Sequence, residues 1–351
     1  YQQSICRRKR LHGLTSLVTV SLFSPLICFA SISKFVPNGN WPLGLEPDFF
    51  IPIDNPITGK KVLLGKQLFF DKQLSKDENI SCAVCHDPAH GFSNGKAVGE
   101  GVFSKKGNRN VPSIINRLFG QTHFWDGRSD TLESQVVGPL LNPNEMAINE
   151  ELLIERLKAD VNYQRLFQEV FDSTPTLENV SQAIAAFERT LLSGATPFDR
   201  YEWDGEKKAL SESAIRGLVL FRGKARCSIC HIGTNFTDEK FHNLGAGEGK
   251  GQKDPGRSQV TKDSVDFGKF KTPTLRNVTL TAPYMHDGSL ATLEDVIAFY
   301  DRGGSPNPNL DKEIKPLKLT NQEKADLLEF LKSLTGPVIS VNVEELKELT
   351  Q

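Results

Sequence analysis

The stretch Cys82-Ala83-Val84-Cys85-His86 has a counterpart much later in the chain, Cys227-Ser228-Ile229-Cys230-His231. The pattern C-x-x-C-H is the attachment site of c-type haem, in which two thioether bonds hold the porphyrin and the histidine binds the iron. Structural zinc also uses C-x-x-C pairs, but those pairs are commonly only about 15–20 residues apart. Disulfides and thioredoxin-like dithiols do not need the histidine. The two motifs therefore predict two covalently bound haem c groups.

The N-terminal segment has the order of a secretory signal. A basic cluster, Arg7-Arg8-Lys9-Arg10, precedes a mostly apolar run from Leu14 to Ala30. We expect a signal peptide over residues 1–33, with an uncleaved membrane anchor as the alternative. Cys6 and Cys28 lie in this segment, which would leave only the haem cysteines in the mature protein. Bacterial haem c is attached outside the cytoplasm, so the expected location is the periplasm.

Length and pattern favour an all-α protein of two domains. The chain has 351 residues and a formal net charge of −1, and no basic stripe suggests a nucleic-acid partner. Apolar residues at helical spacing predict helices over residues 150–171, 177–192 and 211–222. A capping box beginning at Thr320 predicts a further helix near the C-terminus. No convincing run of alternating strands appears.

An internal repeat links the two motifs. Residues 112–133 can be laid on residues 273–294 without a gap, and both copies contain an Asp-Gly pair followed by Thr-Leu-Glu. Trp125 occupies the position of His286 in this alignment. The chain is therefore predicted to contain two related haem modules.

The repeat also predicts an asymmetry between the two haems. A helix beginning after Thr292 would place Leu293 and Tyr300 on one face, and the same offset in the first module falls on Pro139. Tyrosine can bind haem iron and proline cannot. If this helix covers the open side of its haem, the second iron gains a sixth ligand and the first keeps a position for a small oxidant. The alternative is that Tyr300 is an ordinary core aromatic.

With these residues in view, the chain resembles the bacterial di-haem cytochrome c peroxidases and, within them, the MauG-like branch. The resemblance runs from Leu64 to the last capped helix. It is carried by Ser81-Cys82-Ala83-Val84-Cys85-His86, Arg109-Asn110-Val111-Pro112, Phe124-Trp125-Asp126-Gly127-Arg128 and Ala282-Pro283-Tyr284-Met285-His286-Asp287-Gly288. It implies two cytochrome c-like domains, residues 46–200 with a peroxidatic haem and residues 201–340 with an electron-transfer haem.

The resemblance also implies residue roles. The haem-binding residues would be Cys82, Cys85, His86, Cys227, Cys230 and His231, with the two histidines as proximal iron ligands. Gln135 and Glu145 match distal-pocket residues, and Trp125 matches a tryptophan between the haems. Tyr300 falls where the peroxidases have a methionine and the MauG-like branch a tyrosine, with Met285 as the competing ligand. A calcium ion would be held by Asn110, Thr281 and Pro283, the last two through backbone carbonyls.

One departure bears on how the enzyme is activated. Many of these peroxidases carry a histidine, in the loop after the first motif, that blocks the peroxidatic iron. Here Gly99 to Asn110 contains no histidine, and His90 is too close to His86 to span the haem. We therefore expect a first haem that is open at rest.

Three functions follow from these residues. The first is a periplasmic peroxidase that reduces hydrogen peroxide with electrons from a small cytochrome c or cupredoxin, with Glu145 moving the proton during O–O cleavage. The alternative is a MauG-like enzyme that uses high-valent iron to oxidise residues of a protein substrate. A carrier with two saturated haems is the third, and Pro139 argues against it. The sequence does not identify the donor or show whether two copies form a homodimer.

Overall fold

The computed structural model describes residues 41–247 and 254–339. The predicted signal peptide, with Cys6 and Cys28, lies outside these residues. Within them the fold is mostly helical, as predicted, and the strands are short pairs. Strand β1 (Leu192–Ser193) pairs antiparallel with β4 (Val338–Ile339), and β2 (Phe241–His242) with β3 (Phe270–Lys271). No described helix is long and apolar enough to cross a membrane.

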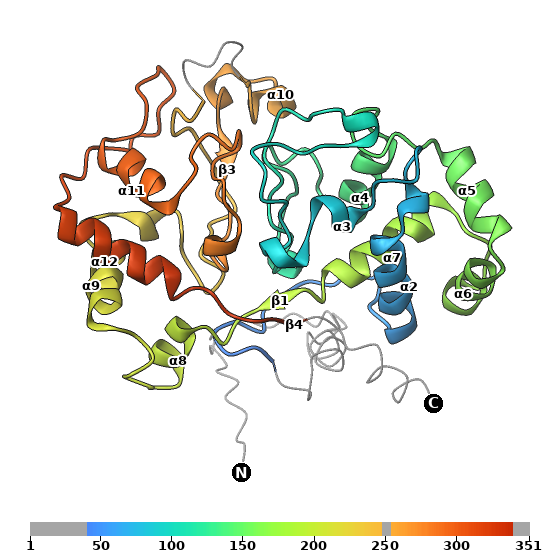
Figure 1. Cartoon of the computed structure of the whole chain (residues 1–351), viewed down its shortest axis with the longest axis horizontal. Helices are drawn as coiled ribbons and strands as arrows, with labels where there is room; N and C mark the ends of the chain where they lie inside the picture. The colour runs from blue at the N-terminus through green and yellow to red at the C-terminus, as the bar shows by residue number, and fades with distance from the viewer. Residues whose placement is uncertain (1–40, 248–253, 340–351) are drawn as a thin grey trace, which may run out of the picture.

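The helices form two halves that lie side by side, with β1 and β4 below the junction between them (Figure 1). The N-terminal half contains α2 (Gly59–Phe70), α3 (Cys82–Cys85), α4 (Leu132–Leu141), α5 (Glu150–Ala159), α6 (Val161–Phe171) and α7 (Leu177–Glu188). The C-terminal half contains α8 (Pro197–Trp203), α9 (Glu212–Arg222), α10 (Ser258–Thr261), α11 (Leu293–Asp301) and α12 (Asn321–Lys332). Short 3-10 helices join them, namely η3 (Lys72–Leu74), η4 (Pro88–His90), η5 (Val102–Ser104), η6 (Arg117–Phe119), η7 (Cys227–Ile229), η8 (Ser264–Asp266) and η9 (Val278–Leu280).

Two helices have boundaries that differ from those predicted from the sequence. The helix expected over residues 150–171 is divided into α5 and α6, because the Asp160 side chain accepts hydrogen bonds from the backbone N–H groups of Asn162 and Tyr163 and so starts a new helix. The helix expected over residues 177–192 ends at Glu188, since the chain then extends into β1. The predicted capping box at Thr320 is confirmed at the start of α12.

The buried apolar residues form two clusters, one in each half. The first includes Leu68 of α2 and Phe187 of α7. The second includes Phe221 of α9 and Phe330 of α12, and it also takes in Phe198 of α8. The division into domains at residue 200 stays a prediction, and the packing of Phe198 brings α8 into the C-terminal half.

Each half is built on the same kind of helix contact. In the first, α2 packs on α7 so closely that a Cβ on Gly65 would lie 1.8 Å from the carbonyl oxygen of Ala183. In the second, α9 packs on α12, and a Cβ on Gly217 would lie 1.9 Å from the carbonyl oxygen of Asp326. Only glycine permits backbones to approach to this distance.

The internal repeat is confirmed in the backbone. Asn116 and Asn277 have nearly the same left-handed conformation, with φ of 57° and 56°. Each is followed by a short 3-10 helix and then by a helix that begins with a capping box, at Thr131 for α4 and at Thr292 for α11. Equivalent positions of the two modules can therefore be compared directly.

Candidate functional site

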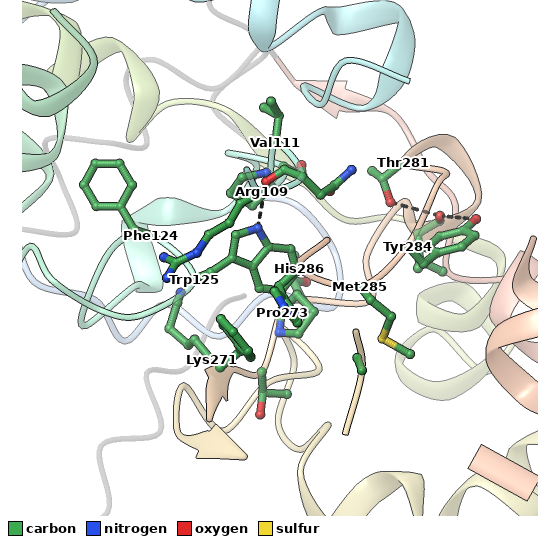
Figure 2. Close-up of a pocket in the computed structure, with 18 of the residues that line it drawn as sticks. Arg109, Val111, Phe124, Trp125, Lys271, Pro273, Thr281, Tyr284, Met285 and His286 are labelled. Atoms are coloured by element: carbon green, nitrogen blue, oxygen red, sulfur yellow. Dashed lines mark hydrogen bonds between the residues drawn. The ribbon is translucent and has the colours of Figure 1, made fainter. Parts of the chain in front are cut away.

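A single cavity of about 870 Å³ runs through both halves of the molecule. Its walls include both C-x-x-C-H motifs, and Trp125 and Lys271 are among the residues that line it. Its other lining residues include all the predicted catalytic and iron-binding side chains: Gln135, Glu145, Met285 and Tyr300. Figure 2 shows the central part, with Phe124 on one side of Trp125 and Met285 on the other.

The first motif directs its histidine into this cavity. The cysteines occupy the single turn of α3, and the backbone N–H of His86 donates to the carbonyl of Cys82 at 2.7 Å. His86 Nδ1 lies 3.0 Å from the carbonyl oxygen of Phe92. A carbonyl only accepts, so Nδ1 carries the proton and Nε2 keeps a lone pair for a metal.

The second motif repeats this arrangement. The backbone N–H of His231 donates to the carbonyl of Cys227 at 2.9 Å, and His231 Nδ1 lies 2.9 Å from the carbonyl oxygen of Phe236. Burial raises the pKa of Cys227 to about 12 and that of Cys85 to about 11, so neither is a thiolate at neutral pH. Each motif thus offers the cavity two partly buried thiols and one imidazole nitrogen with a lone pair, which fits two covalently held haem groups.

The zinc alternative fits poorly. One group in the described residues has suitable spacing for a metal, Cys230 with Asp238 and His242. His242 also contacts Asp311 at 2.6 Å and Asp238 at 3.1 Å. The cysteines of the first motif are not part of this group, so within the described residues the two C-x-x-C pairs do not form one four-cysteine zinc site.

Three predicted residues lie along the first haem's part of the cavity. Gln135 and Pro139 are on α4, and Glu145 follows in the next loop. Glu145 is half-buried, and burial raises its pKa despite the nearby charge of Arg128 and a hydrogen bond from Asn142 Nδ2 to Oε1 at 2.8 Å. The carboxyl group is thus placed to hold or release a proton inside the cavity.

The loop without a histidine packs directly on the Glu145 segment. The backbone N–H of Val102 donates to the carbonyl of Glu145 at 2.8 Å, and a Cβ on Gly101 would lie 2.3 Å from the carbonyl oxygen of Asn144. His90 is exposed and its Nδ1 faces Asp87 at 3.1 Å. The loop therefore packs against the backbone of the Glu145 segment without offering an imidazole of its own.

Tyr300 and Met285 both reach the second haem's part of the cavity. Tyr300 is on α11, the helix predicted to carry it, and burial together with Cys227 and Cys230 raises its pKa. Met285 precedes His286 and has a left-handed backbone, with φ of 71°. Both side chains line the cavity, so both are placed to serve as the iron ligand.

Trp125 joins the two modules through the backbone of Asn110. Trp125 Nε1 donates to the carbonyl of Asn110 at 2.8 Å, and the N–H of Asn110 donates to the carbonyl of His286 at 2.7 Å. The carbonyl of Trp125 in turn accepts from the N–H of Lys271 at 2.8 Å. The indole is therefore fixed at the contact between the halves.

The ion pairs of Arg109 hold the segment that contains Asn110. Arg109 Nη1 lies 2.7 Å from Asp126, and the same guanidinium binds Asp254 at 2.7 and 2.8 Å. Its carbon lies 5.5 Å from the centre of the Phe270 ring, which stacks on His286 at 3.6 Å. One side chain of the first module thus contacts three groups around Trp125 and His286.

Two of the three predicted calcium-binding residues meet. Asn110 Nδ2 lies 3.2 Å from the carbonyl oxygen of Pro283 and 3.0 Å from that of Lys96. Thr281 lines the same cavity, and its hydroxyl donates to the carbonyl of Val278. The amide and carbonyl groups gathered around Asn110 are of the type that calcium prefers.

Two cavity-lining residues were missed by the sequence patterns. His123 and Glu188 are both buried against the cavity, and neither belongs to a recognised motif. Burial, then the charges of Arg117 and Lys271, lowers the pKa of His123 to about 3. The only signal in the sequence was the place of His123 just before the Phe-Trp-Asp-Gly-Arg segment.

Comparisons with known proteins agree with this geometry. A family model described as di-haem cytochrome c peroxidase matches residues 59–208. The methylamine utilization protein MauG of Methylorubrum extorquens is 41% identical over 301 residues, which is 84% of each chain. Cytochrome c551 peroxidase of Nitrosomonas europaea is 35% identical over 324 residues, which is 91% of each chain. The solved structure of a MauG-like protein associated with microbial copper homeostasis has a TM-score of 0.77 at 36% identity, covering 85% of this chain and 96% of that chain.

Proposed function

The chain belongs to the di-haem cytochrome c peroxidase family, and we propose that it is a periplasmic peroxidase that reduces hydrogen peroxide to water. The electrons would come one at a time from a small cytochrome c or cupredoxin. The observation that carries a reaction with peroxide at the first haem is the contrast between Pro139 and Tyr300, because it would leave only the first iron open. Both are the eighth residue after a helix-capping threonine, and only the second can bind iron.

The first site would carry out the reaction with peroxide. A haem iron held by His86 would supply the redox chemistry of O–O cleavage. Glu145 takes the proton from one peroxide oxygen and delivers it to the other, so that water leaves. The Asn142 amide donates a hydrogen bond to Oε1 of Glu145, so Oε2 is the atom that holds the transferred proton. Gln135 donates a hydrogen bond that orients the oxidant.

The second site would supply electrons. His231 and Tyr300 would both hold the second haem iron, which would leave no position there for peroxide. Trp125 lies between the two motifs and provides an aromatic group for electron transfer across the contact of the halves. Two electrons and two protons convert one peroxide molecule into two of water, so the donor must deliver one electron twice.

A calcium ion at Asn110, Thr281 and Pro283 is part of this proposal. It would hold the Asn110 segment, and through it Trp125, in place. Metal analysis of protein purified without chelators should give one calcium per chain, and a chelator should slow turnover reversibly. Full activity after complete removal of calcium would refute this role.

The alternative function is MauG-like oxidation of residues in a protein substrate. Tyr300 favours it, because this position carries a tyrosine in that branch. The relatives include a MauG protein and a MauG-like protein as well as peroxidases. In this case the same two sites would draw electrons from a protein surface and not from a dedicated carrier.

Peroxide turnover with reduced donors distinguishes these two functions. The holoprotein is mixed with hydrogen peroxide and either reduced cytochrome c or a reduced cupredoxin, and donor oxidation is followed by absorbance. The peroxidase proposal requires catalytic oxidation of at least one donor, two molecules for each peroxide. Rapid reaction with peroxide but no turnover with either donor would favour the MauG-like function.

A further inference from the structure

A buried group of charges crosses the contact between the two halves. Arg117, from the first module, binds Glu239 of the second through Nη1 at 3.0 Å and Nη2 at 3.2 Å. Lys271 Nζ lies 3.2 Å from the same carboxylate. All three side chains are at most 10% exposed. We call Arg117, Glu239 and Lys271 the junction cluster.

The junction cluster has one more cation than anion. Burial lowers the pKa of Lys271 to about 8, so it is still largely charged at neutral pH, and Glu239 is held ionised by Arg117 and Lys271 with a pKa of about 2. A buried charge without a partner is costly and normally has a counter-ion. Both cations line the cavity, so an anionic group bound in the cavity would balance their charge.

A second observation points to the same kind of ligand. Glu188 is 4% exposed and lines the cavity, and its Oε2 atom is buried with no hydrogen-bond partner in the described structure. Burial raises its pKa to about 8, so at neutral pH it carries a proton that it can donate. Glu188, His123 and Arg117 all line the same cavity. This wall therefore offers mainly hydrogen-bond donors.

Donors with a net positive charge suit a carboxylate. Haem carries two propionate carboxylates on the edge opposite its vinyl groups, and in haem c the vinyl edge is held by the cysteines. The propionates must therefore lie deeper in the cavity than the thioether bonds. The junction cluster lies next to Trp125, because Lys271 N–H donates to the Trp125 carbonyl, and so faces the region between the two motifs.

We propose that Arg117 and Lys271, one from each module, bind haem propionate at the contact between the halves, and that His123 and Glu188 donate hydrogen bonds to it. This inference rests on haem binding and not on the substrate. Since Arg117 and Lys271 come from different modules, a substitution in either module should change the reduction potential of the haem whose propionate they bind. No motif assigns haem binding to any of these four residues.

Lys271→Met tests the proposal in the holoprotein by redox titration of both haems without peroxide. Removing a cation beside the haem disfavours the reduced state, so one haem's reduction potential should fall. A tenfold shift toward the oxidised form corresponds to about 59 mV for one electron. Lys271→Arg should restore most of the potential. The control is Lys240→Met, at an exposed lysine of the same hairpin, which should change neither haem.

Glu239→Gln provides a test with the opposite sign. It removes the anion of the junction cluster, so the reduction potential of the same haem should rise. If the Lys271→Met variant does not bind both haems, the potential measured in Glu239→Gln tests the proposal on its own. Resonance Raman bands of the propionates should shift in both variants. Unchanged potentials and propionate bands in variants that carry two haems by mass would overturn the proposal. So would a shift that follows added chloride, because the anion would then be an exchangeable ion.

Discussion

Trp125 and His286 occupy the same position in the two modules, and the backbone of a single residue, Asn110, connects them. The Trp125 indole donates to the carbonyl of Asn110, and the N–H of Asn110 donates to the carbonyl of His286. His286 is 5% exposed and stacked on Phe270. The repeat has thus kept the position and changed the side chain, so that the indole at this contact comes from the first module only.

Trp125→Phe should separate the structural part of this contact from electron transfer. Phenylalanine keeps an aromatic ring but leaves the Asn110 carbonyl without its donor, a loss of about 1–3 kcal/mol for a buried group. We expect a lower melting temperature and slower electron transfer between the haems, followed by stopped-flow absorbance. Trp203→Phe, at an exposed tryptophan of α8, is the control and should change neither. Wild-type electron transfer in Trp125→Phe would remove the indole from the route.

Haem attachment at the two motifs should be independent. Cys82→Ser removes one thioether of the first haem, and Cys227→Ser removes one of the second. Mass spectrometry of the purified protein should show two haem additions in the wild type and weakened attachment of only the corresponding haem in each variant. Loss of both haems from either variant would contradict two separate modules.

Glu145→Gln should slow the reaction with peroxide by about 10²–10⁴-fold, the usual contribution of a general acid–base group. Glutamine keeps the hydrogen-bonding shape but cannot accept the proton. The rate is measured by rapid mixing of the resting holoprotein with peroxide. Glu155→Gln, at an exposed position of α5, should react like the wild type. An unchanged rate in Glu145→Gln would exclude it as the base.

The pH dependence of the same rate should report Glu145 directly. The carboxylate is the proton-accepting form, and burial raises its pKa above the usual value of about 4.3. The rate should therefore rise with pH through this raised pKa and level off above it. In Glu145→Gln this rise should be absent. A rise that persists in the variant would belong to another group.

The sequence predicted the local parts of this structure well. The haem motifs, the repeat and the capped helices α11 and α12 depend on residues within a few positions of one another. The division of residues 150–171 was missed because one side chain, Asp160, competes with helix continuation.

The junction cluster could not be predicted in this way. Arg117 and Glu239 are 122 positions apart, and neither lies in a motif. The burial of Glu188 likewise depends on how α7 meets the cavity. Such contacts come from the packing of the two halves and leave no periodic signal in the sequence.

The close helix contacts lead to a prediction about stability. Gly217→Ala gains about 1 kcal/mol of helix propensity but places a Cβ 1.9 Å from the Asp326 carbonyl oxygen. Because that atom belongs to the backbone, α9 and α12 must move apart, and such overpacking typically costs about 1–3 kcal/mol. We expect a lower melting temperature. Val219→Ala, at an exposed position of α9, should stay within about 0.5 kcal/mol of the wild type.

The last prediction concerns the sixth ligand of the second haem. Tyr300 and Met285 both line the cavity, so the choice depends on chemistry and on position in the repeat. Tyr300 is on α11 at the offset of Pro139 in α4, whereas Met285 is equivalent to Phe124, a packing residue whose ring lies 3.4 Å from the Arg128 guanidinium carbon. Methionine ligation would raise the reduction potential, and a tyrosinate would favour ferric iron. Tyr300→Phe should therefore change the low-spin EPR signal and raise the potential of the second haem, while Met285→Leu should leave both nearly unchanged. The reverse pair of results would make Met285 the ligand.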